Sequence, residues 1–277
     1  MNYPKISVIT PSYNQAQFLE RTIKSIIEQD YPNLEYIVCD GGSNDGSVEI
    51  IKKYADKITW WCSEKDKGQS DAINKGLKRA TGDIVCWINS DDVLLKGALM
   101  EYARMYKENP DCSVYMAQTM RIDENDNVIY FHILPKLYPC FYKNGILNVP
   151  QQSWAWKREI FDTIGYINEE RHACMDLEFL MRQIRAGYKI AYSQKTIGAI
   201  RLYEGTKTSG DNMSGGNNIW ERDRKVMKVE FVDFNYQNVS TIARFRYRLI
   251  KIVNGIYLKQ YILTKRYKGR KYTEYTK

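Results

Sequence analysis

The sequence predicts an α/β fold in which a mostly parallel sheet is flanked by helices and followed by a C-terminal helical extension. The first observation is that short apolar runs alternate with helix-like segments through residues 1–100, the pattern of a parallel sheet covered by helices. The second is size, because 277 residues with 44% hydrophobic content can bury a large core. The third is a basic C-terminal segment whose apolar residues recur at helical spacing.

Strands and helices are expected to alternate in order along the first hundred residues. Short apolar runs predict strands at 6–10, 34–39, 58–62 and 84–88. Apolar residues spaced three and four apart predict helices at 15–29, 47–54, 69–80 and 96–107. Beyond these, the alternation weakens into mixed strand and loop with one clear helix at 175–186. We expect this second half to extend the sheet and to wall a cleft.

Cysteine and histidine usage argues against several kinds of site. The six cysteines form no CxxC pair and have no histidine cluster beside them, which argues against a zinc site and a disulfide framework. Neither His132 nor His172 has a nucleophile motif nearby, so triad chemistry is not expected. No signal sequence or run of about 18 apolar residues is present, so we expect a cytoplasmic protein that does not span a membrane.

Polar loops follow all four predicted strands. In open α/β sheets, ligands bind at the carboxyl ends of the strands. The loops there read PSYN, DGGSNDG, SEKDKG and NSDD. We therefore expect a ligand site at this rim, built largely from carboxylates.

Asp91 and Asp92 are the strongest candidates for a metal site. Two adjacent carboxylates at a strand end are costly unless a cation lies beside them, and hard divalent ions take oxygen ligands of this kind. A helix is predicted directly after them, so N-capping is an equally good explanation from these residues alone. Asp40, with the glycines after it, leaves a similar choice between binding a base or ribose and turn formation.

At this point the chain resembles glycosyltransferase family 2, which has a GT-A fold. The resemblance rests on PSYNQAQFLERTIKSIIEQDYPNLEYIVCDGGSNDGSVEII and SEKDKGQSDAINKGLKRATGDIVCWINSDD, with a weaker echo through Gln152, Gly165 and 175–179 to about Lys207. It implies a GT-A (Rossmann-like) catalytic domain over 1–210, with a nucleotide-binding half at 1–100 and an acceptor half at 101–210. A basic helical extension would occupy 211–277.

The resemblance implies roles for particular residues. The base and ribose would contact Pro11, Tyr13, Asp40, Asp66, Gln69 and Asn74. Asp91 would touch the ribose or the metal, and Asp92 would hold Mn²⁺ or Mg²⁺ on the diphosphate, where the ion offsets the charge of the leaving group. Arg201 and Lys207 would bind phosphate oxygens or be solvated surface charges.

Asp176 matches the acceptor-side carboxylate of the family, at the start of a predicted helix. There it would take the proton of the attacking hydroxyl, and direct displacement would invert the anomeric centre. Glu178 is a competing base, and Asp176 could instead be a first-turn acid of the helix. One departure from the family is Tyr203, which stands where a histidine commonly helps to hold the metal.

The C-terminal segment is strongly basic. Residues 231–277 contain eleven Lys and Arg residues against Asp233 and Glu274, so the net charge of +8 lies in the tail. Its apolar stripe predicts either an amphipathic helix that rests on an anionic membrane surface through residues 241–272, or a helix that packs on the domain. Nucleic-acid binding is not expected, because no recognised module accompanies the charge.

These observations predict an inverting, metal-dependent transferase that moves a sugar from a nucleoside-diphosphate sugar, most often UDP-linked in this family. The acceptor would be a cell-envelope or capsular glycan, or a lipid-linked glycan, with the protein cytoplasmic and peripheral on the inner face of the membrane. One alternative is a non-catalytic protein that binds sugar nucleotide or membrane. Another is a nucleotidyltransferase, which would need a glycine-rich loop after the first strand that this sequence lacks.

Overall fold

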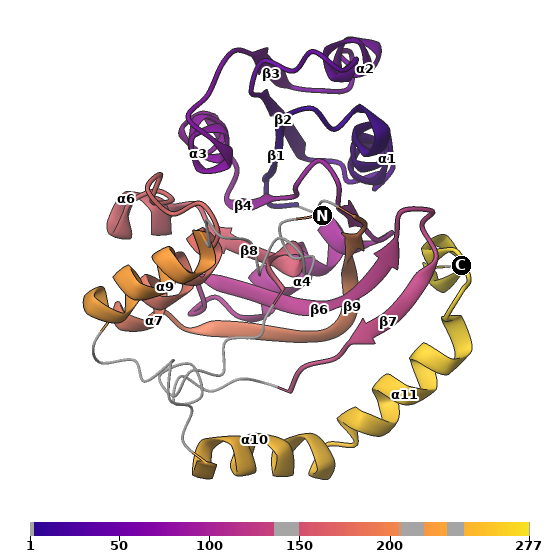
Figure 1. Ribbon diagram of the computed structural model, residues 1–277, viewed down its shortest axis with the longest axis vertical. Helices are drawn as coiled ribbons and strands as arrows, with labels where there is room; N and C mark the ends of the chain where they lie inside the picture. Colours follow the sequence, from indigo (N-terminus) through magenta and orange to yellow (C-terminus); the bar gives the residue numbers. More distant parts are fainter. Residues whose placement is uncertain (1–2, 136–149, 205, 207–218, 232–240, 277) are drawn as a thin grey trace.

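A mixed nine-stranded sheet runs through the computed structural model, which describes residues 3–135, 150–204, 206, 219–231 and 241–276 (Figure 1). The strand order is β3-β2-β1-β4-β8-β6-β9-β5, with β7 paired to β6. The strands are β1 (Ile6–Ser12), β2 (Leu34–Asp40), β3 (Trp60–Ser63), β4 (Ile84–Trp87), β5 (Val93–Leu94), β6 (Val114–Asp123), β7 (Val128–His132), β8 (Trp154–Lys157) and β9 (Ile190–Leu202).

The helices come between and after these strands. They are α1 (Ala16–Ile27), α2 (Ser47–Lys53), α3 (Gln69–Arg79), α4 (Ala98–Glu108), α6 (Glu159–Ile164), α7 (Met175–Arg185), α9 (Ile219–Glu230), α10 (Thr241–Val253) and α11 (Ile256–Tyr267). The predicted α/β fold with flanking helices and a helical C-terminal end is confirmed. All the strands and helices predicted in the first hundred residues are present, with ends that differ by a few residues.

The two halves of the sheet differ in strand direction. Strands β1, β2, β3 and β4 pair only in parallel with one another, as the alternation of apolar runs and helices predicts. In the second half, β8 is antiparallel to both β4 and β6, whereas β6 and β9 are parallel. The parallel prediction therefore holds for the first half of the sheet, and the sheet as a whole is mixed.

Apolar side chains cover both faces of the sheet, because successive residues of a strand point to opposite sides. Ile9 of β1 packs in a core cluster that includes buried residues of α3 and α7. Val8, its neighbour, packs in a second cluster that includes buried residues of α1 and α4. Trp87 and Trp156 stack across the β4–β8 pair, with ring centroids 4.5 Å apart. This rigid double layer holds the carboxyl ends of the strands in place.

The three C-terminal helices differ in how closely they pack on the rest of the protein. Helix α9 is part of the body, since Met227 and Phe231 at its end are buried in the same cluster as α7. Helix α10 lies at the far edge of the molecule, and α11 returns along β7 toward the carboxyl ends of the strands (Figure 1). No helix among the described residues is long and apolar enough to cross a bilayer.

Candidate active site

A cavity of about 580 Å³ opens at the carboxyl ends of β1 and β4. It lies where the polar loops were expected to meet. Eight of the eleven predicted site residues line it: Pro11, Tyr13, Asp66, Gln69, Asp91, Asp92, Asp176 and Arg201. The fold therefore brings together residues from both halves of the chain.

Asp92 is a buried carboxylate, with 2% of its surface exposed. Its Oδ1 accepts the backbone N–H of Arg201 at 2.9 Å, and its Oδ2 accepts side-chain N–H groups of Gln152 at 2.8 Å and Asn89 at 3.3 Å. Burial, together with the negative charge of Asp91, raises the pKa of Asp92 to about 8. Neutral donors thus hold the side chain in one orientation, and no cation of the described residues is paired with it.

The structure does not support the capping explanation for these two aspartates. Residues Val93–Leu94 form the short strand β5, which pairs with β9, and α4 begins only at Ala98 after Gly97. Asp91 instead faces Tyr203, whose hydroxyl donates to Asp91 Oδ2 at 3.1 Å. The carboxylate pair therefore lies at the cavity wall without capping the helix.

The donor set at the pair suits a hard divalent ion. Mg²⁺ is typically held by one or two carboxylates together with phosphate oxygens and water, which is what Asp91, Asp92 and a diphosphate offer. Across the described part of the chain, no group of three or more His, Cys, Asp or Glu residues forms a complete metal cage. An ion here would therefore depend on ligands supplied by a bound nucleotide.

Asp66 and Gln69 line the cavity at the start of α3. Asp66 Oδ1 accepts the N–H of Gly68 at 2.9 Å, and burial raises the pKa of Asp66. Gln69 donates to Asn89 Oδ1 at 2.7 Å and so connects α3 to the loop of the aspartate pair. Gly41 lies directly against Asp66, since a Cβ at Gly41 would be 2.5 Å from Asp66 Oδ2.

Among the described residues, two predicted site residues do not line the cavity. The Asp40 carboxylate accepts hydrogen bonds from the backbone of Gly42 and Ser43 and from the hydroxyls of Ser43 and Ser63, which is the turn-forming alternative. Asn74 binds the backbone N–H and carbonyl of Ile167 through its amide and so joins α3 to the second half. Lys207 lies outside the described residues.

The start of α7 favours Asp176 over Glu178 as a group that meets ligand. Asp176 lines the cavity, whereas the buried Glu178 forms an ion pair with Arg182, with Nε to Oε1 at 2.7 Å. The backbone N–H groups of residues 172–174, just before α7, all donate to the buried carboxylate of Asp223 on α9. These donors precede the helix, and within its first turn Asp176 Oδ1 accepts the N–H of Leu177 at 2.8 Å.

Arg201 lies at the cavity, but its guanidinium does not point to solvent. The side chain is fully buried, is ion-paired with Asp126 at 2.6 Å, and donates from Nε to the carbonyl of Asp91 at 2.8 Å. The alternative that Arg201 is a solvated surface charge is therefore wrong, because the side chain is buried. Its binding of phosphate oxygens stays a prediction.

Sequence reasoning missed some residues of the cavity wall. Gln152, which orients Asp92, was noted only as part of the weaker echo of the family. Gln15 donates to the Tyr203 hydroxyl at 3.1 Å, and Arg121 of β6 lines the cavity. Their positions depend on strand pairing between distant segments. Each is locally recognisable only as a polar residue next to an apolar run.

Comparisons with known proteins agree with this geometry. Residues 7–167 match the family model of glycosyl transferase family 2. The chain is 33% identical over 224 residues to glycosyltransferase GlyA of Streptococcus pneumoniae, covering 73% of this chain and 31% of the relative. It is 41% identical over 100 residues to a GalNAc(5)-diNAcBac-PP-undecaprenol beta-1,3-glucosyltransferase of Campylobacter jejuni, covering 35% of this chain and 32% of the relative. The chain thus spans about a third of each relative's length.

Two solved structures share the fold. TarS of S. aureus, residues 1–349 with UDP-GlcNAc, matches with a TM-score of 0.63 at 23% identity, covering 83% of this chain and 66% of TarS. The mannosyltransferase PcManGT of Pyrobaculum calidifontis, with GDP-Man and Mn²⁺, matches with a TM-score of 0.58 at 20% identity, covering 81% and 61% of the two chains.

Proposed function

Because the chain belongs to glycosyltransferase family 2, we propose that it transfers a sugar from a nucleoside-diphosphate sugar to a hydroxyl group of an acceptor glycan. The observation that carries this proposal is the pair formed by the half-buried Asp91 and the buried Asp92, which lines one cavity together with Asp176. In this proposal residues 1–100 bind the donor, 101–210 bind the acceptor, and 211–277 form the extension.

On the donor side, the nucleotide would lie between the end of β1 and the start of α3. Pro11 and Tyr13 would line one side of the base and ribose, and Asp66 and Gln69 the other. Asp91 and Asp92 would hold Mn²⁺ or Mg²⁺. The ion, when bound, supplies positive charge that offsets the charge developing on the diphosphate as the bond to the sugar breaks.

On the acceptor side, Asp176 would act as the general base. The acceptor hydroxyl oxygen would form a bond to the anomeric carbon, the bond from that carbon to the diphosphate oxygen would break, and Asp176 would receive the hydroxyl proton. A single displacement of this kind inverts the anomeric centre. The ion pair of Glu178 with Arg182 supports this choice, because it leaves Asp176 as the acid of the first turn of α7 that lines the cavity.

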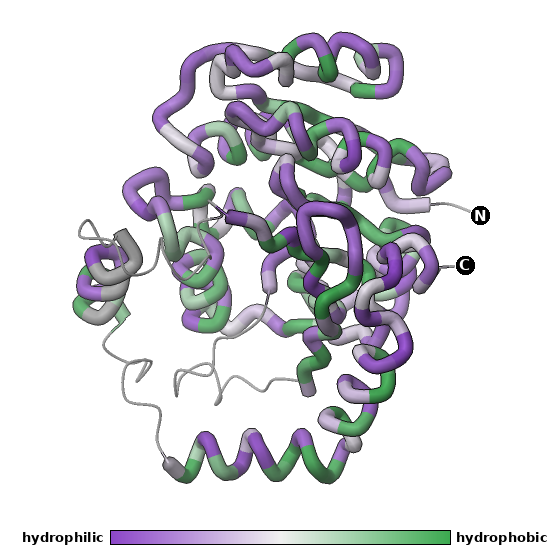
Figure 2. The backbone as a smooth tube through the Cα atoms, turned by 45° about the vertical axis from the view of Figure 1, so that its right-hand side comes forward, coloured by the Kyte–Doolittle hydropathy of each residue, from purple (hydrophilic) through white to green (hydrophobic). Residues whose placement is uncertain are grey.

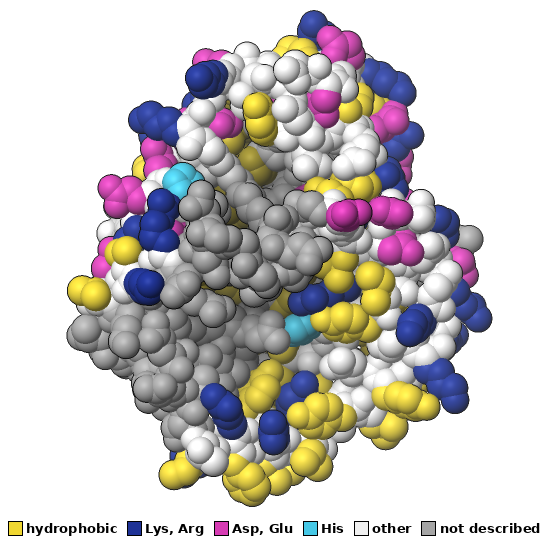
Figure 3. All heavy atoms as spheres, viewed as in Figure 1, with side chains coloured by type: hydrophobic (Ala, Val, Ile, Leu, Met, Phe, Trp, Pro, Cys, Tyr) yellow, Lys and Arg dark blue, Asp and Glu magenta, His cyan; other side chains and the backbone are white. Residues whose placement is uncertain are grey.

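Helices α10 and α11 support a peripheral position on an anionic membrane, as expected for an enzyme with a lipid-linked acceptor. The apolar stripe predicted for α10 is not packed on the domain, since Ile242, Phe245 and Ile252 are 64–66% exposed. Residues 241–272 contain ten Lys and Arg and no acidic residue. Apolar and basic side chains gather along this edge of the molecule (Figure 3), and hydrophobic and hydrophilic residues alternate along α10 (Figure 2).

The magnitudes favour membrane contact. Each apolar side chain that inserts contributes about 1.5–3 kcal/mol, and each basic residue near an anionic surface contributes about 1 kcal/mol. Cosedimentation with vesicles of anionic lipid measures this directly. We expect binding that weakens in Phe245→Glu, in which a side chain 66% exposed is changed. Met100→Glu on α4 is the control, because it makes the same change at an exposed apolar position, 43% exposed, outside the C-terminal helices. Equal binding of the two variants and the wild type would contradict a role for α10.

The central test is calorimetric titration with UDP, GDP and dTDP, each with and without Mn²⁺. We expect one nucleotide to bind in a Mn²⁺-dependent way and Asp92→Asn to lose that dependence. Asp176→Asn should keep the nucleotide affinity and lose transfer by about 10²–10⁴-fold, the range for removing a general base. Absence of nucleotide binding in the folded wild type would instead favour the non-catalytic alternative.

A further inference from the structure

The turn between β6 and β7 is held rigidly by its own side chains. Asp123 Oδ1 accepts the backbone N–H groups of Asn125 and Asn127 at 2.9 and 2.8 Å, and its Oδ2 accepts the Asn127 side chain at 2.9 Å. Within the turn, Asp126 adopts a left-handed conformation with φ of 68°. Aspartate and asparagine tolerate this conformation better than most residues. The turn therefore presents the Asp126 carboxylate in a fixed direction.

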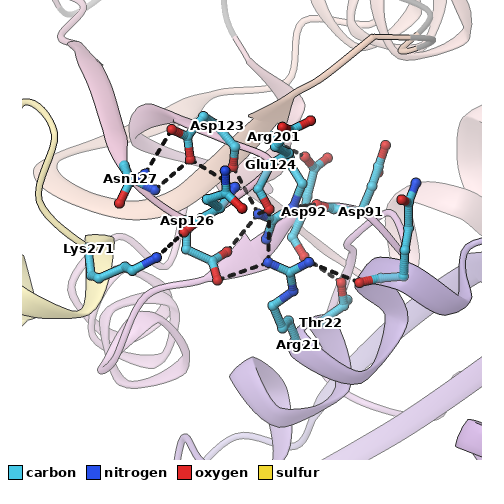
Figure 4. A network of polar contacts seen from close by, with 12 residues as sticks. Arg21, Thr22, Asp91, Asp92, Asp123, Glu124, Asp126, Asn127, Arg201 and Lys271 are labelled. Atoms are coloured by element: carbon cyan, nitrogen blue, oxygen red, sulfur yellow. Dashed lines mark hydrogen bonds and ion pairs between the residues drawn. The ribbon is translucent and has the colours of Figure 1, made fainter.

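The Asp126 carboxylate joins two arginines that come from opposite parts of the chain (Figure 4). Its Oδ2 accepts Arg21 of α1 at 3.0 Å, and its Oδ1 is paired with Arg201 of β9 at 2.6 Å. Arg201 in turn donates from Nε to the carbonyl of Asp91 and from its backbone N–H to Asp92 Oδ1. One intervening residue, Arg201, thus connects Asp126 to both members of the aspartate pair.

The C-terminal segment after α11 pairs with the same turn. The Tyr272 N–H donates to the carbonyl of Asp126 at 3.0 Å, and Val128 exchanges backbone hydrogen bonds with Gly269 and Arg270 at 2.9 and 2.8 Å. Lys271 adds an ion–dipole contact from its ammonium to the carbonyl of Asn125. Residues 269–272 therefore hold the turn from the side opposite the arginines.

We propose that Asp126 is a positioning residue of the donor site, and that residues 269–272 form a brace that holds it there. The brace fixes the turn, the turn fixes Arg201, and Arg201 fixes the Asp91 backbone and the Asp92 carboxylate. This inference rests on the proposed role of Asp91 and Asp92 in holding the metal and the diphosphate. It connects the C-terminal segment to the donor site, because α11 leads directly into the brace.

The test compares Asp126→Asn with Asp111→Asn. Asparagine keeps the size and tolerates the left-handed backbone of Asp126, so the substitution removes the negative charge that Arg201 and Arg21 face. Asp111 is 82% exposed and its ion pair with Lys189 is 3.8 Å long, which makes the second variant a matched surface control. The measurement is calorimetry of nucleotide binding with and without Mn²⁺, with the melting temperature measured alongside.

We expect Asp126→Asn to weaken Mn²⁺-dependent nucleotide binding by about 10–100-fold, the usual effect of losing a group that orients metal ligands. Nucleotide binding without Mn²⁺ depends in this proposal on the Asp66 side of the cavity and should be unchanged. A general loss of structure would weaken binding both with and without Mn²⁺. Wild-type Mn²⁺ dependence in the folded variant would overturn the brace. Loss of binding in the wild type itself would count against the proposed function instead.

A second variant tests the brace if Asp126→Asn does not fold. Lys271→Met removes one exposed side-chain contact of the brace and leaves Asp126 and both arginines in place. A weakening of Mn²⁺-dependent binding by about threefold or more, with metal-free binding unchanged, supports the brace. Binding equal to that of the wild type overturns it.

Discussion

Asp92 and Glu101 are both buried carboxylates, 2% and 1% exposed, yet their surroundings push their pKa values in opposite directions. Burial and the charge of Asp91 raise the pKa of Asp92 to about 8. Burial also acts to raise the pKa of Glu101 on α4, but hydrogen bonds from Arg104, Lys195 and Ser193 outweigh it and hold that pKa at about 2.

The difference lies in the partners. Lys195 lies 2.7 Å from Glu101, and Arg104 is a second cation on the same carboxylate, so its charge is compensated within the protein. Asp92 receives hydrogen bonds from neutral donors, beside a second acid. Buried charge costs free energy unless it is paired, so the first carboxylate stabilises the fold and the second is suited to an added cation.

Removing the charge of Asp92 should have the largest effect on activity. We expect Asp92→Asn to lower transfer by about 10²–10³-fold, because the diphosphate would lose the ion that offsets its charge. Its free energy of unfolding without metal should stay within about 1 kcal/mol of the wild type, since no cation of the described residues is paired with Asp92. Initial-rate assays and urea unfolding measure the two quantities. Normal transfer in this variant would refute the metal role of the pair.

Removing the charge of Glu101 should lower the stability of the fold and leave nucleotide binding unchanged. Glu101→Gln leaves Arg104 and Lys195 without their carboxylate, and we expect a loss of about 1–3 kcal/mol in the free energy of unfolding. The loss is kept modest because both partners reach solvent, where their charges are hydrated. Nucleotide affinity should not change. A fall in nucleotide affinity at unchanged stability would reverse the assignment of the two carboxylates.

The same comparison predicts a pH dependence of stability. The pKa of Glu101 is about 2 in the folded chain against 4.5 for an ordinary glutamate, so the unfolded chain binds more protons between these values. The contribution of Glu101 is therefore complete above pH 4.5 and is lost as the pH falls toward 2. Urea unfolding at pH 7, 5, 4 and 3 should show the gap between wild type and Glu101→Gln closing toward pH 3. A gap that stays constant would exclude this ion pair as its source.

Local sequence patterns predicted the elements that carry the site but not the partners of its side chains. The four strands and the loops after them follow from runs of a few residues, and the fold places eight of the expected residues around one cavity. Strand β5 has two residues and forms only because β9, about a hundred residues later, pairs with it. No local signal distinguishes it from the helix that was expected there.

Two further differences between the expected and observed side-chain partners, at Asp40 and Arg201, also arise from tertiary packing. Asp40 has the sequence neighbourhood of a ligand-binding carboxylate, but its hydrogen bonds are made within the loop 40–43 and to Ser63. The solvated alternative for Arg201 is wrong, because Asp126 pairs with the buried guanidinium from a turn that is 75 residues away. Which partner wins is decided by tertiary packing, which brings distant charges together and buries them.

Asp66 extends the comparison to the nucleotide side of the cavity, since burial raises its pKa as it does for Asp92. A methyl group at Gly41 would lie 2.5 Å from Asp66 Oδ2, so Gly41→Ala should displace this carboxylate. We expect nucleotide affinity to fall by about 5–10-fold, equivalent to about 1 kcal/mol, both with and without Mn²⁺. Gly187→Ala is a control for the loss of a glycine, because a Cβ there meets no atom within 4 Å, although its φ of 80° is itself unfavourable for alanine. Titration calorimetry separates the two ends of the cavity: a loss in Gly41→Ala that appears only with Mn²⁺ would place Asp66 with the metal pair rather than with the nucleotide.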